Sequence, residues 1–221
     1  MPGMPRLHHV GFLIGLLSIS SPAFAAPILP SAQTTIAPNG FAWGTPGAAT
    51  GNHFHNGMVN AGEMGVEEER GVVEFDLAAE GLVGSAVLTF DSARFRTCCV
   101  GVTGGSYTIG VFSYVGDTTT ALSDYQAVGT LLGSFSTAGL AVGTPFSFDV
   151  TAAFNTNAGG SLGIRLQALS EPEQTSYTFD NFQINTTAGA VPEPGTMLML
   201  GTGLTGAAVR YRRRRSERRT V

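Results

Sequence analysis

Residues 70–77 read RGVVEFDL, and their side chains alternate between the two faces of an extended backbone. The two faces carry Val73, Phe75 and Leu77 on one side and Val72, Glu74 and Asp76 on the other. A period of two residues is typical of a β-strand with one buried face. This stretch therefore predicts a strand whose two carboxylates point toward solvent.

Segments of similar character follow along the chain, separated by Gly, Asp, Asn, Ser and Thr. Further strands are expected at residues 36–43, 85–91, 107–115, 146–150, 161–169 and 177–184. No helical period of useful length and no internal repeat accompanies them. The pattern predicts one all-β domain, an antiparallel β-sandwich of the jelly-roll type.

Two stretches are expected to be long loops: the remainder of residues 26–65, and residues 116–129. The last strand changes face along its length, with Tyr177 and Phe179 on one side and Phe182 and Ile184 on the other. A bulge near Asp180 and Asn181 would restore the register.

Charge divides the chain into an acidic middle and a basic end. The 221 residues are 43% hydrophobic and 13% charged, which is typical of a folded protein. Residues 26–190 carry 4 Arg against 14 Asp and Glu, whereas 7 of the 12 Arg lie within 210–219 and Lys is absent. Because phosphate would be repelled by the acidic domain, no nucleic-acid partner is expected.

The N-terminus has the three parts of a secretory signal peptide. Arg6 precedes the apolar run VGFLIGLLSI at residues 10–19, and small residues at Ala23 and Ala25 follow. Residues 1–25 are therefore predicted to be removed by signal peptidase after export through the secretion machinery, leaving a domain at 26–190.

The C-terminal segment, residues 191–221, contains three ordered elements. Pro192, Glu193 and Pro194 come first, followed by the uncharged residues 195–209 and the Arg-rich residues 210–219. As a helix, 195–209 would be about 22 Å long, a marginal transmembrane span. The Arg block predicts that the tail stays in the cytoplasm while the domain lies outside.

These three elements together resemble the PEP-CTERM sorting signal of Gram-negative, exopolysaccharide-producing bacteria. The resemblance implies that an exosortase recognises Pro192, Glu193 and Pro194 and removes the helix and tail. The protein would be anchored transiently in the inner membrane and then released to the cell surface or extracellular matrix. The short helix and Glu217 within the Arg block depart from the usual pattern. A permanent anchor remains the alternative.

The order of four segments in the middle region is similar to jelly-roll carbohydrate-binding modules: RGVVEFDL, SAVLTF, FDVTAAFN and SLGIRLQAL. This resemblance covers about a hundred residues and implies a noncatalytic sandwich that is often stabilised by calcium. It carries over no ligand-binding position.

Two kinds of binding site are candidates. Aromatic rings stack on sugar rings, and the candidate platform residues are Trp43, Tyr114, Tyr125 and Tyr177, with ordinary core or edge packing as the alternative for each. Calcium prefers carboxylate and amide oxygens, and the candidate ligands are Asp180 and Asn181 at the bulge and Asp117 and Asp124 in the Thr-rich loop. No cofactor other than calcium is expected.

Catalytic and metal motifs are weak. Glu74 and Asp76 could form a glycosidase pair, but alternating carboxylates are also typical of a solvent-facing strand. His53 and His55 have a spacing that can hold zinc or copper, although they lie in a stretch that reads as a solvated loop. The run Glu67-Glu68-Glu69 also reads as a solvated loop, and the adjacent Cys98 and Cys99 as buried, unpaired thiols.

The sequence therefore favours a secreted, noncatalytic protein of the cell surface or biofilm matrix that contacts exopolysaccharide. A structural, adhesive or ice-binding matrix protein is the alternative, and an extracellular glycoside hydrolase is a third hypothesis.

Overall fold

The computed structural model describes residues 25–38, 52–54, 57–64, 67–97 and 105–188. Within these ranges the chain forms ten strands and two short helices. The strands are β1 (Ala32–Pro38), β2 (Asn52–Phe54), β3 (Val59–Met64), β4 (Glu67–Asp76), β5 (Val83–Thr97), β6 (Thr108–Val115), β7 (Thr130–Ser136), β8 (Pro145–Asp149), β9 (Ser161–Ala168) and β10 (Thr175–Ala188). The helices are α1 (Leu122–Gln126) and α2 (Thr151–Asn157).

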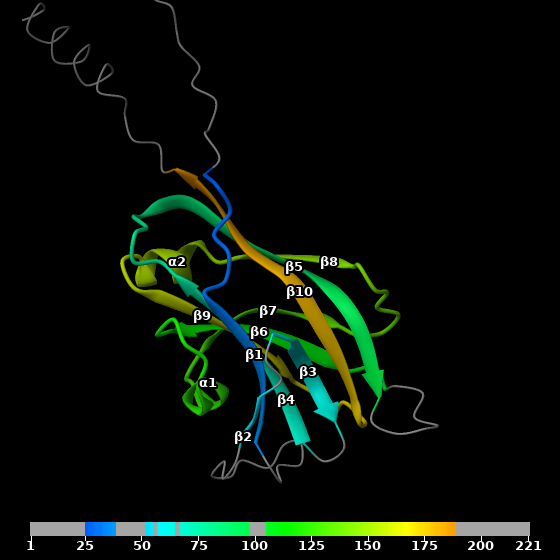
Figure 1. The fold of residues 1–221 in the computed structure, drawn as a ribbon. Helices are drawn as coiled ribbons and strands as arrows, with labels where there is room; N and C mark the ends of the chain where they lie inside the picture. Colours follow the sequence, from blue (N-terminus) through cyan, green and yellow to red (C-terminus); the bar gives the residue numbers. More distant parts are fainter. Residues whose placement is uncertain (1–24, 39–51, 55–56, 65–66, 98–104, 189–221) are drawn as a thin grey trace, which may run out of the picture.

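All strand pairs are antiparallel and follow the order β7-β6-β9-β4-β3-β10-β5-β8, with β1 added to β4 and β2 to β1 (Figure 1). One layer contains β3, β5, β8 and β10, and the other contains β1, β2, β4, β6, β7 and β9. β4 joins the layers because residues 67–69 pair with β3 and residues 71–76 pair with β9. The predicted antiparallel sandwich is confirmed.

The core lies between the two layers and is rich in aromatic rings. Phe90 stacks on Phe146 and Phe182 at centroid distances of 5.1 and 4.8 Å, and meets Phe179 edge-on at 5.7 Å. Phe135 of β7 also lies 4.1 Å from Phe146 of β8. These contacts draw the two ends of the strand order together, so the sandwich is nearly barrel-like.

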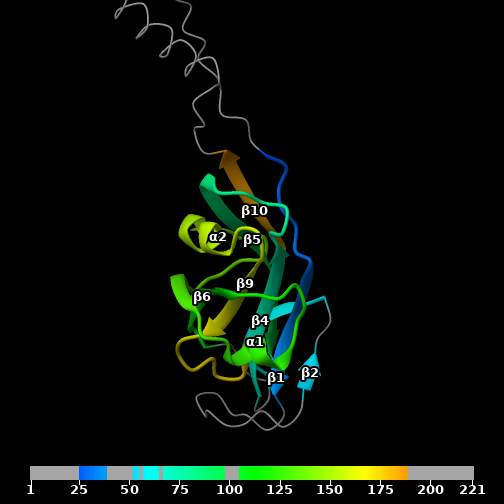
Figure 2. The same cartoon turned by 90° about the vertical axis from the view of Figure 1, so that its left-hand side faces the viewer.

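α1 covers the layer that contains β1, β4 and β9, whereas α2 packs against strands of both layers. α1 packs on β1, β4 and β9, and α2 packs on β5, β6 and β9. Both helices lie on the left-hand side of Figure 1, and the turned view in Figure 2 shows α1 beside β1 and β4. The loop predicted at 116–129 therefore contains a helix that shields one face of the sheet.

Several strand boundaries differ from the prediction. The strand predicted at 36–43 is β1 at Ala32–Pro38, and residues 39–51 lie outside the described residues. β2, β3 and β7 were not predicted, and the expectation of a long loop is wrong for residues 52–54 and 59–64, which form β2 and β3. β3 reads VNAGEM and has little strand propensity, so its pairing with β10 and β4 defines it.

The bulge predicted in the last strand is confirmed. Asp180 pairs with Asp91 and Gln183 with Thr89, so two residues of β10 stand opposite one residue of β5. Asn181 has φ of 56°, in the left-handed region that asparagine tolerates better than most residues. The bulge turns Phe182 back into the core.

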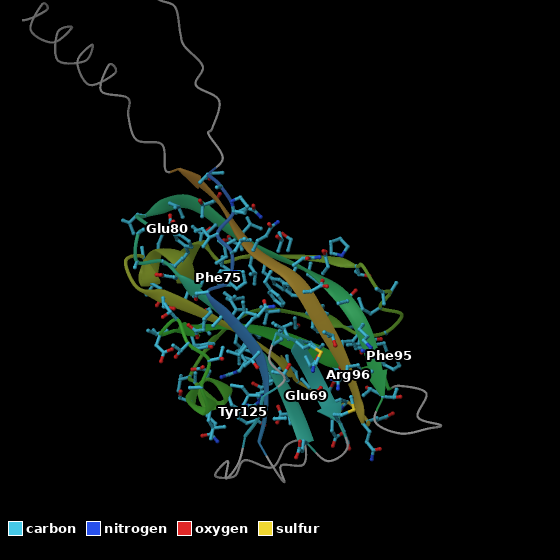
Figure 3. All side chains as sticks on the ribbon, in the orientation of Figure 1. Glu69, Phe75, Glu80, Phe95, Arg96 and Tyr125 are labelled. Atoms are coloured by element: carbon cyan, nitrogen blue, oxygen red, sulfur yellow. The ribbon has the colours of Figure 1, made fainter. Side chains whose placement is uncertain are left out.

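The expectation of a solvated loop at 67–69 is wrong. These residues begin β4, where Glu68 is 5% exposed and Glu69 is 1% exposed. Ser176 donates to Glu69 at 2.5 Å, and Arg96 donates to it at 3.3 Å. Figure 3 shows Glu69 and Arg96 close together at the lower end of the sandwich. Arg96 of β5 and Ser176 of β10 therefore bind the Glu69 carboxylate, which the sequence pattern predicted to be solvated.

No helix among the described residues is long and apolar enough to cross a bilayer. The predicted signal peptide and the predicted helix at 195–209 lie outside the described residues.

Candidate functional site

Glu74 lies fully buried on the outer side of β4, beneath the connection that contains α1. Its Oε1 accepts a hydrogen bond from the Tyr114 hydroxyl at 2.6 Å. Its Oε2 accepts from Ser161 Oγ at 3.0 Å and from the backbone N–H groups of Asp117 and Thr118 at 3.1 and 3.3 Å. Four donors thus offset the cost of removing the carboxylate from water. We call this outer side of β4, β6 and β9 the covered face.

A glycine lets the Tyr114–Glu74 bond cross a strand. Gly163 of β9 pairs with Glu74 on one side and with Tyr114 on the other, so the tyrosine ring passes over β9 to reach the carboxylate. A Cβ at position 163 would lie 2.2 Å from the Cζ atom of the ring. Since carbon atoms pack at about 3.5 to 4.0 Å, no larger residue fits beneath the ring.

The turn at 116–118 is shaped around the same carboxylate. A Cβ at Gly116 would lie 1.9 Å from Oε2 of Glu74. Thr118 has φ of 72°, which is uncommon for a residue with a branched Cβ. This turn directs two consecutive N–H groups at one carboxylate oxygen, so Glu74 anchors the start of the connection.

Glu68 and Arg70 anchor the same connection at α1. The Nε and Nη2 atoms of Arg70 donate to Glu68 at 2.8 and 3.2 Å, and Nη1 donates to the carbonyl oxygen of Tyr125 at 2.6 Å. The guanidinium carbon lies 3.9 Å from the centre of the Tyr125 ring, and the tyrosine hydroxyl donates to Glu68 at 3.1 Å. The Arg70 guanidinium therefore contacts both the Tyr125 ring and the Glu68 carboxylate, and the Tyr125 hydroxyl bonds the same carboxylate.

Arg165 of β9 holds the end of α1. Its Nη1 donates to the carbonyl oxygens of Asp124 and Ala127 at 3.0 and 2.7 Å, and its guanidinium lies 5.4 Å from the centre of the Phe112 ring. Among the described residues, its Nε is the one buried side-chain nitrogen or oxygen atom without a hydrogen-bond partner. Burial lowers the pKa of Arg165 to about 10, so it remains charged at neutral pH.

Burial dominates the pKa values on this face. It raises the pKa of Glu74 and of Asp124. It also raises the pKa of Tyr114 and of Tyr125, so both hydroxyls remain protonated donors. The opposite holds for exposed Asp117, whose pKa is lowered by the hydrogen bond from the Thr119 side chain.

The structure bears on two predictions here: the catalytic pair of Glu74 and Asp76, and the sugar contacts at Tyr114 and Tyr125. Glu74 does not point to solvent and is closed to a substrate, while Asp76 is exposed and accepts from the N–H of Ala78 at 2.9 Å. The pair therefore lacks the shared open site that a glycosidase needs. Tyr114 and Tyr125 are 4% and 3% exposed, so they offer no ring face to a sugar.

Asp117 and Asp124, predicted as calcium ligands, serve the local backbone. Asp117 accepts from the N–H and the hydroxyl of Thr119 at 3.0 and 2.7 Å. Asp124 accepts from the N–H of Ala121 at 2.7 Å, which caps α1. Whether either binds calcium stays a prediction.

The outer side of β5, β8 and β10 has a different character, and we call it the open face. Gln183 of β10 pairs with Thr89 of β5, and Thr89 pairs with Ser147 of β8. Residues that pair directly point to the same side of a sheet. An amide and two hydroxyls therefore form a row across three strands, at about 4.8 Å per strand.

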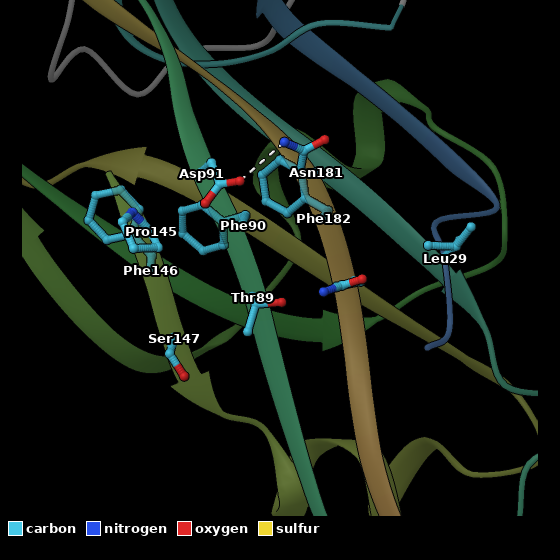
Figure 4. A pocket seen from close by; sticks show the side chains of 10 residues that line it. Leu29, Thr89, Phe90, Asp91, Pro145, Phe146, Ser147, Asn181 and Phe182 are labelled. Atoms are coloured by element: carbon cyan, nitrogen blue, oxygen red, sulfur yellow. Dashed lines mark hydrogen bonds between the residues drawn. The ribbon is translucent and has the colours of Figure 1, made fainter. Parts of the chain in front are cut away.

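This row lies in a pocket of about 650 Å³. The lining residues are Leu29, Thr89, Phe90, Asp91, Pro145, Phe146, Ser147, Asn181, Phe182 and Gln183. Figure 4 shows Asp91 and Asn181 joined by a hydrogen bond of 3.1 Å at one end of the pocket, with Leu29 on the far side of β10. Phe90 and Phe182 are 1% and 3% exposed and belong to the core, so the exposed part of the lining is Leu29 and Pro145 with the polar side chains.

The second predicted calcium pair borders this pocket. Asp180 and Asn181 are exposed, and Asp180 stands directly opposite Asp91 in the register. No group of three or more His, Cys, Asp or Glu side chains suited to a metal occurs among the described residues. Calcium binding at Asp180 and Asn181 stays a prediction.

The remaining candidates have varied placements. Tyr177 is half-buried, and its ring lies 5.0 Å from that of Phe95. His53 lies in β2, where it pairs with Ala37. The candidates outside the described residues are Trp43, His55, Cys98, Cys99, Pro192, Glu193 and Pro194.

Sequence reasoning missed the polar residues of the open face. The odd-numbered positions of β5 and the positions after the bulge in β10 alternate with core residues. Thr89, Asp91 and Gln183 could have been found from that alternation. The alternation does not indicate that β10 pairs with β5 and β5 with β8, which is what brings these side chains together.

A family model described as the PEP-CTERM protein-sorting motif matches residues 190–214. The chain therefore carries this sorting motif, as Pro192, Glu193 and Pro194 predicted, and the motif indicates an exported protein of the cell surface or extracellular space. A comparison with curated proteins found no match.

Among solved structures, the chain is similar to a xylanase of Cellvibrio japonicus in complex with xylopentaose, with 11% identity and a TM-score of 0.41 over 75% of this chain and 29% of the xylanase. An adhesin domain of the Lys-gingipain of Porphyromonas gingivalis is 15% identical, with a TM-score of 0.39 over 76% of this chain and 100% of that domain. A tandem carbohydrate-binding module of Paenibacillus barcinonensis is 11% identical, with a TM-score of 0.35 over 80% of this chain and 49% of the tandem. No function is carried over from these three.

Proposed function

We propose that this chain is a secreted, noncatalytic protein of the cell surface or extracellular matrix that binds exopolysaccharide through the pocket on the open face. The observation that carries the proposal is the row of Gln183, Thr89 and Ser147 within that pocket. Amide and hydroxyl groups both donate and accept hydrogen bonds, as sugar hydroxyls do.

The apolar lining supports the same ligand class. Leu29 is 64% exposed, and it lines the pocket together with Pro145 and Phe146. Sugar rings present C–H faces between their hydroxyls, and apolar side chains take up such faces while polar neighbours fix the orientation.

The sorting motif supports the proposed route. Signal peptidase removes residues 1–25, the helix predicted at 195–209 holds the chain in the inner membrane, and an exosortase cleaves near Pro192, Glu193 and Pro194. Mass spectrometry of the mature protein tests this route. Cleavage near residue 194 is expected, and alanine at those three positions should leave the C-terminal segment attached. A mature protein that keeps residues 195–219 would establish a permanent anchor instead.

Calorimetry tests the binding proposal. The full-length chain is titrated with the exopolysaccharide of its own organism, first with calcium and then with a chelator. Saturable binding is expected, and its loss with chelator would add a calcium site at Asp180 and Asn181. No binding under either condition would favour the structural, adhesive or ice-binding alternative. Release of reducing ends from the polymer would overturn the noncatalytic assignment.

A further inference from the structure

The open face is acidic. Asp91 lines the pocket, Asp180 stands opposite it on β10, and Asp149 stands on β8 opposite Val87. Asp149 accepts from the N–H and the hydroxyl of Thr151, which lowers its pKa. These three carboxylates give the face a negative field at neutral pH.

Three of the four arginines of the domain are held away from this face. Arg70 and Arg96 form ion pairs with Glu68 and Glu69, and Arg165 is buried on the covered face. Arg94 is exposed and stands opposite Thr178, two residues or about 7 Å along β10 from Asp180, so it offsets one of the three carboxylates and leaves the face with a net negative charge.

Asp91 can only accept hydrogen bonds when ionised. Asn181 already donates to its Oδ2, and Asp91 lines the pocket. A sugar hydroxyl can donate to them, whereas a sugar carboxylate would meet like charge within a few ångströms. Such juxtaposition disfavours binding more strongly in a partly buried pocket than in open water.

We propose that the pocket selects neutral glycans over anionic ones, that the row of Gln183, Thr89 and Ser147 makes the hydrogen bonds, and that Asp91 excludes uronic acids. This selectivity rests on the proposed function, because it names the class of exopolysaccharide that the same pocket takes.

The test uses one polymer in two charge states. Full-length chain is titrated with the exopolysaccharide before and after carboxyl reduction, which converts uronic acids into neutral sugars. The reduced polymer should bind about tenfold more tightly. Asp91→Asn should shrink this ratio to about twofold, and Asp76→Asn on the other layer should leave it unchanged.

A second matched pair tests the row. Gln183→Ala should weaken binding of the reduced polymer about fivefold, whereas Thr187→Ala, four residues along β10, bonded to Ser85 and outside the pocket lining, should not. The basic residues 210–219 attract the acidic polymer equally in every variant, so their effect cancels when the affinity ratio of one variant is compared with that of another.

The outcomes separate the two proposals. Equal or tighter binding of the acidic polymer, with a ratio that Asp91→Asn does not change, would overturn the selectivity and leave the proposed function standing. Failure to bind either form would overturn the proposed function itself.

Discussion

The covered face and the open face carry polar side chains at the same strand spacing and use them differently. On the covered face, Glu74 and Glu68 meet donors from the connection above them. On the open face, Gln183 and Thr89 line a pocket. The comparison teaches that alternation along a strand identifies polar positions, and that the element packed above them decides whether they stabilise the fold or remain available to a ligand.

The largest effect is expected from Glu74→Gln. Gln keeps one oxygen, so either Ser161 and the two backbone N–H groups or the Tyr114 hydroxyl lose the acceptor they donate to, and the charge-assisted bonds become neutral ones. We expect a loss of about 3 kcal/mol in the free energy of unfolding, measured by denaturant titration. Asp76→Asn, two residues away and exposed, should change it by less than about 0.5 kcal/mol. Equal effects would mean that the network does not stabilise the fold.

Gly163→Ala is expected to cost about 2 kcal/mol, because the added methyl group displaces the Tyr114 ring from its bond with Glu74. Gly81 has no atom within 4 Å of its would-be Cβ, so Gly81→Ala is the matched control and should be neutral or slightly stabilising. Thermal unfolding of the two variants compares them directly. A neutral Gly163→Ala would contradict the crossing described for the ring.

The covered face also predicts a pH dependence. Between the ordinary value of 4.5 and the raised folded pKa of Glu74, the folded chain binds more protons than the unfolded chain. The contribution of Glu74, and likewise that of Asp124, therefore makes the chain more stable as pH falls from 7 toward 5. Unfolding titrations at both pH values should show a smaller gain in Glu74→Gln. If the gain in stability at lower pH is the same in Glu74→Gln, titratable groups other than Glu74 cause it.

The smallest effect on stability belongs to the open face. Gln183→Ala and Asn185→Ala remove half-exposed side chains that point away from the core. Each should change the melting temperature by no more than about 2 °C. A large loss in either variant would mean that the open face, like the covered face, stabilises the fold.

The period of two in RGVVEFDL was sufficient to predict the all-β fold, and the change of face in the last strand was sufficient to predict its bulge. β3 could not be predicted, because Gly62 adopts φ of 146° and a Cβ there would lie 2.3 Å from the carbonyl oxygen of Thr175. Tertiary packing, rather than propensity, makes that segment a strand.

The sites were predicted less well, for a related reason. Glu74 was predicted to face solvent, and Tyr114 and Tyr125 were candidate sugar contacts, because nothing in a loop-like sequence indicates that the 116–129 connection folds back over β4 and β9. Arg70 and Arg165 hold that connection by donating hydrogen bonds to its backbone carbonyl oxygens. Any residue type supplies such an oxygen, so the sequence pattern does not indicate these bonds.

The most direct test of the account is the affinity of the Gln183→Ala variant for the exopolysaccharide, measured by calorimetry on chain whose stability has been shown to equal that of the unmodified protein. The account predicts about fivefold weaker binding by a fully folded variant. Unchanged affinity in that variant would contradict the assignment of the open face as the binding surface.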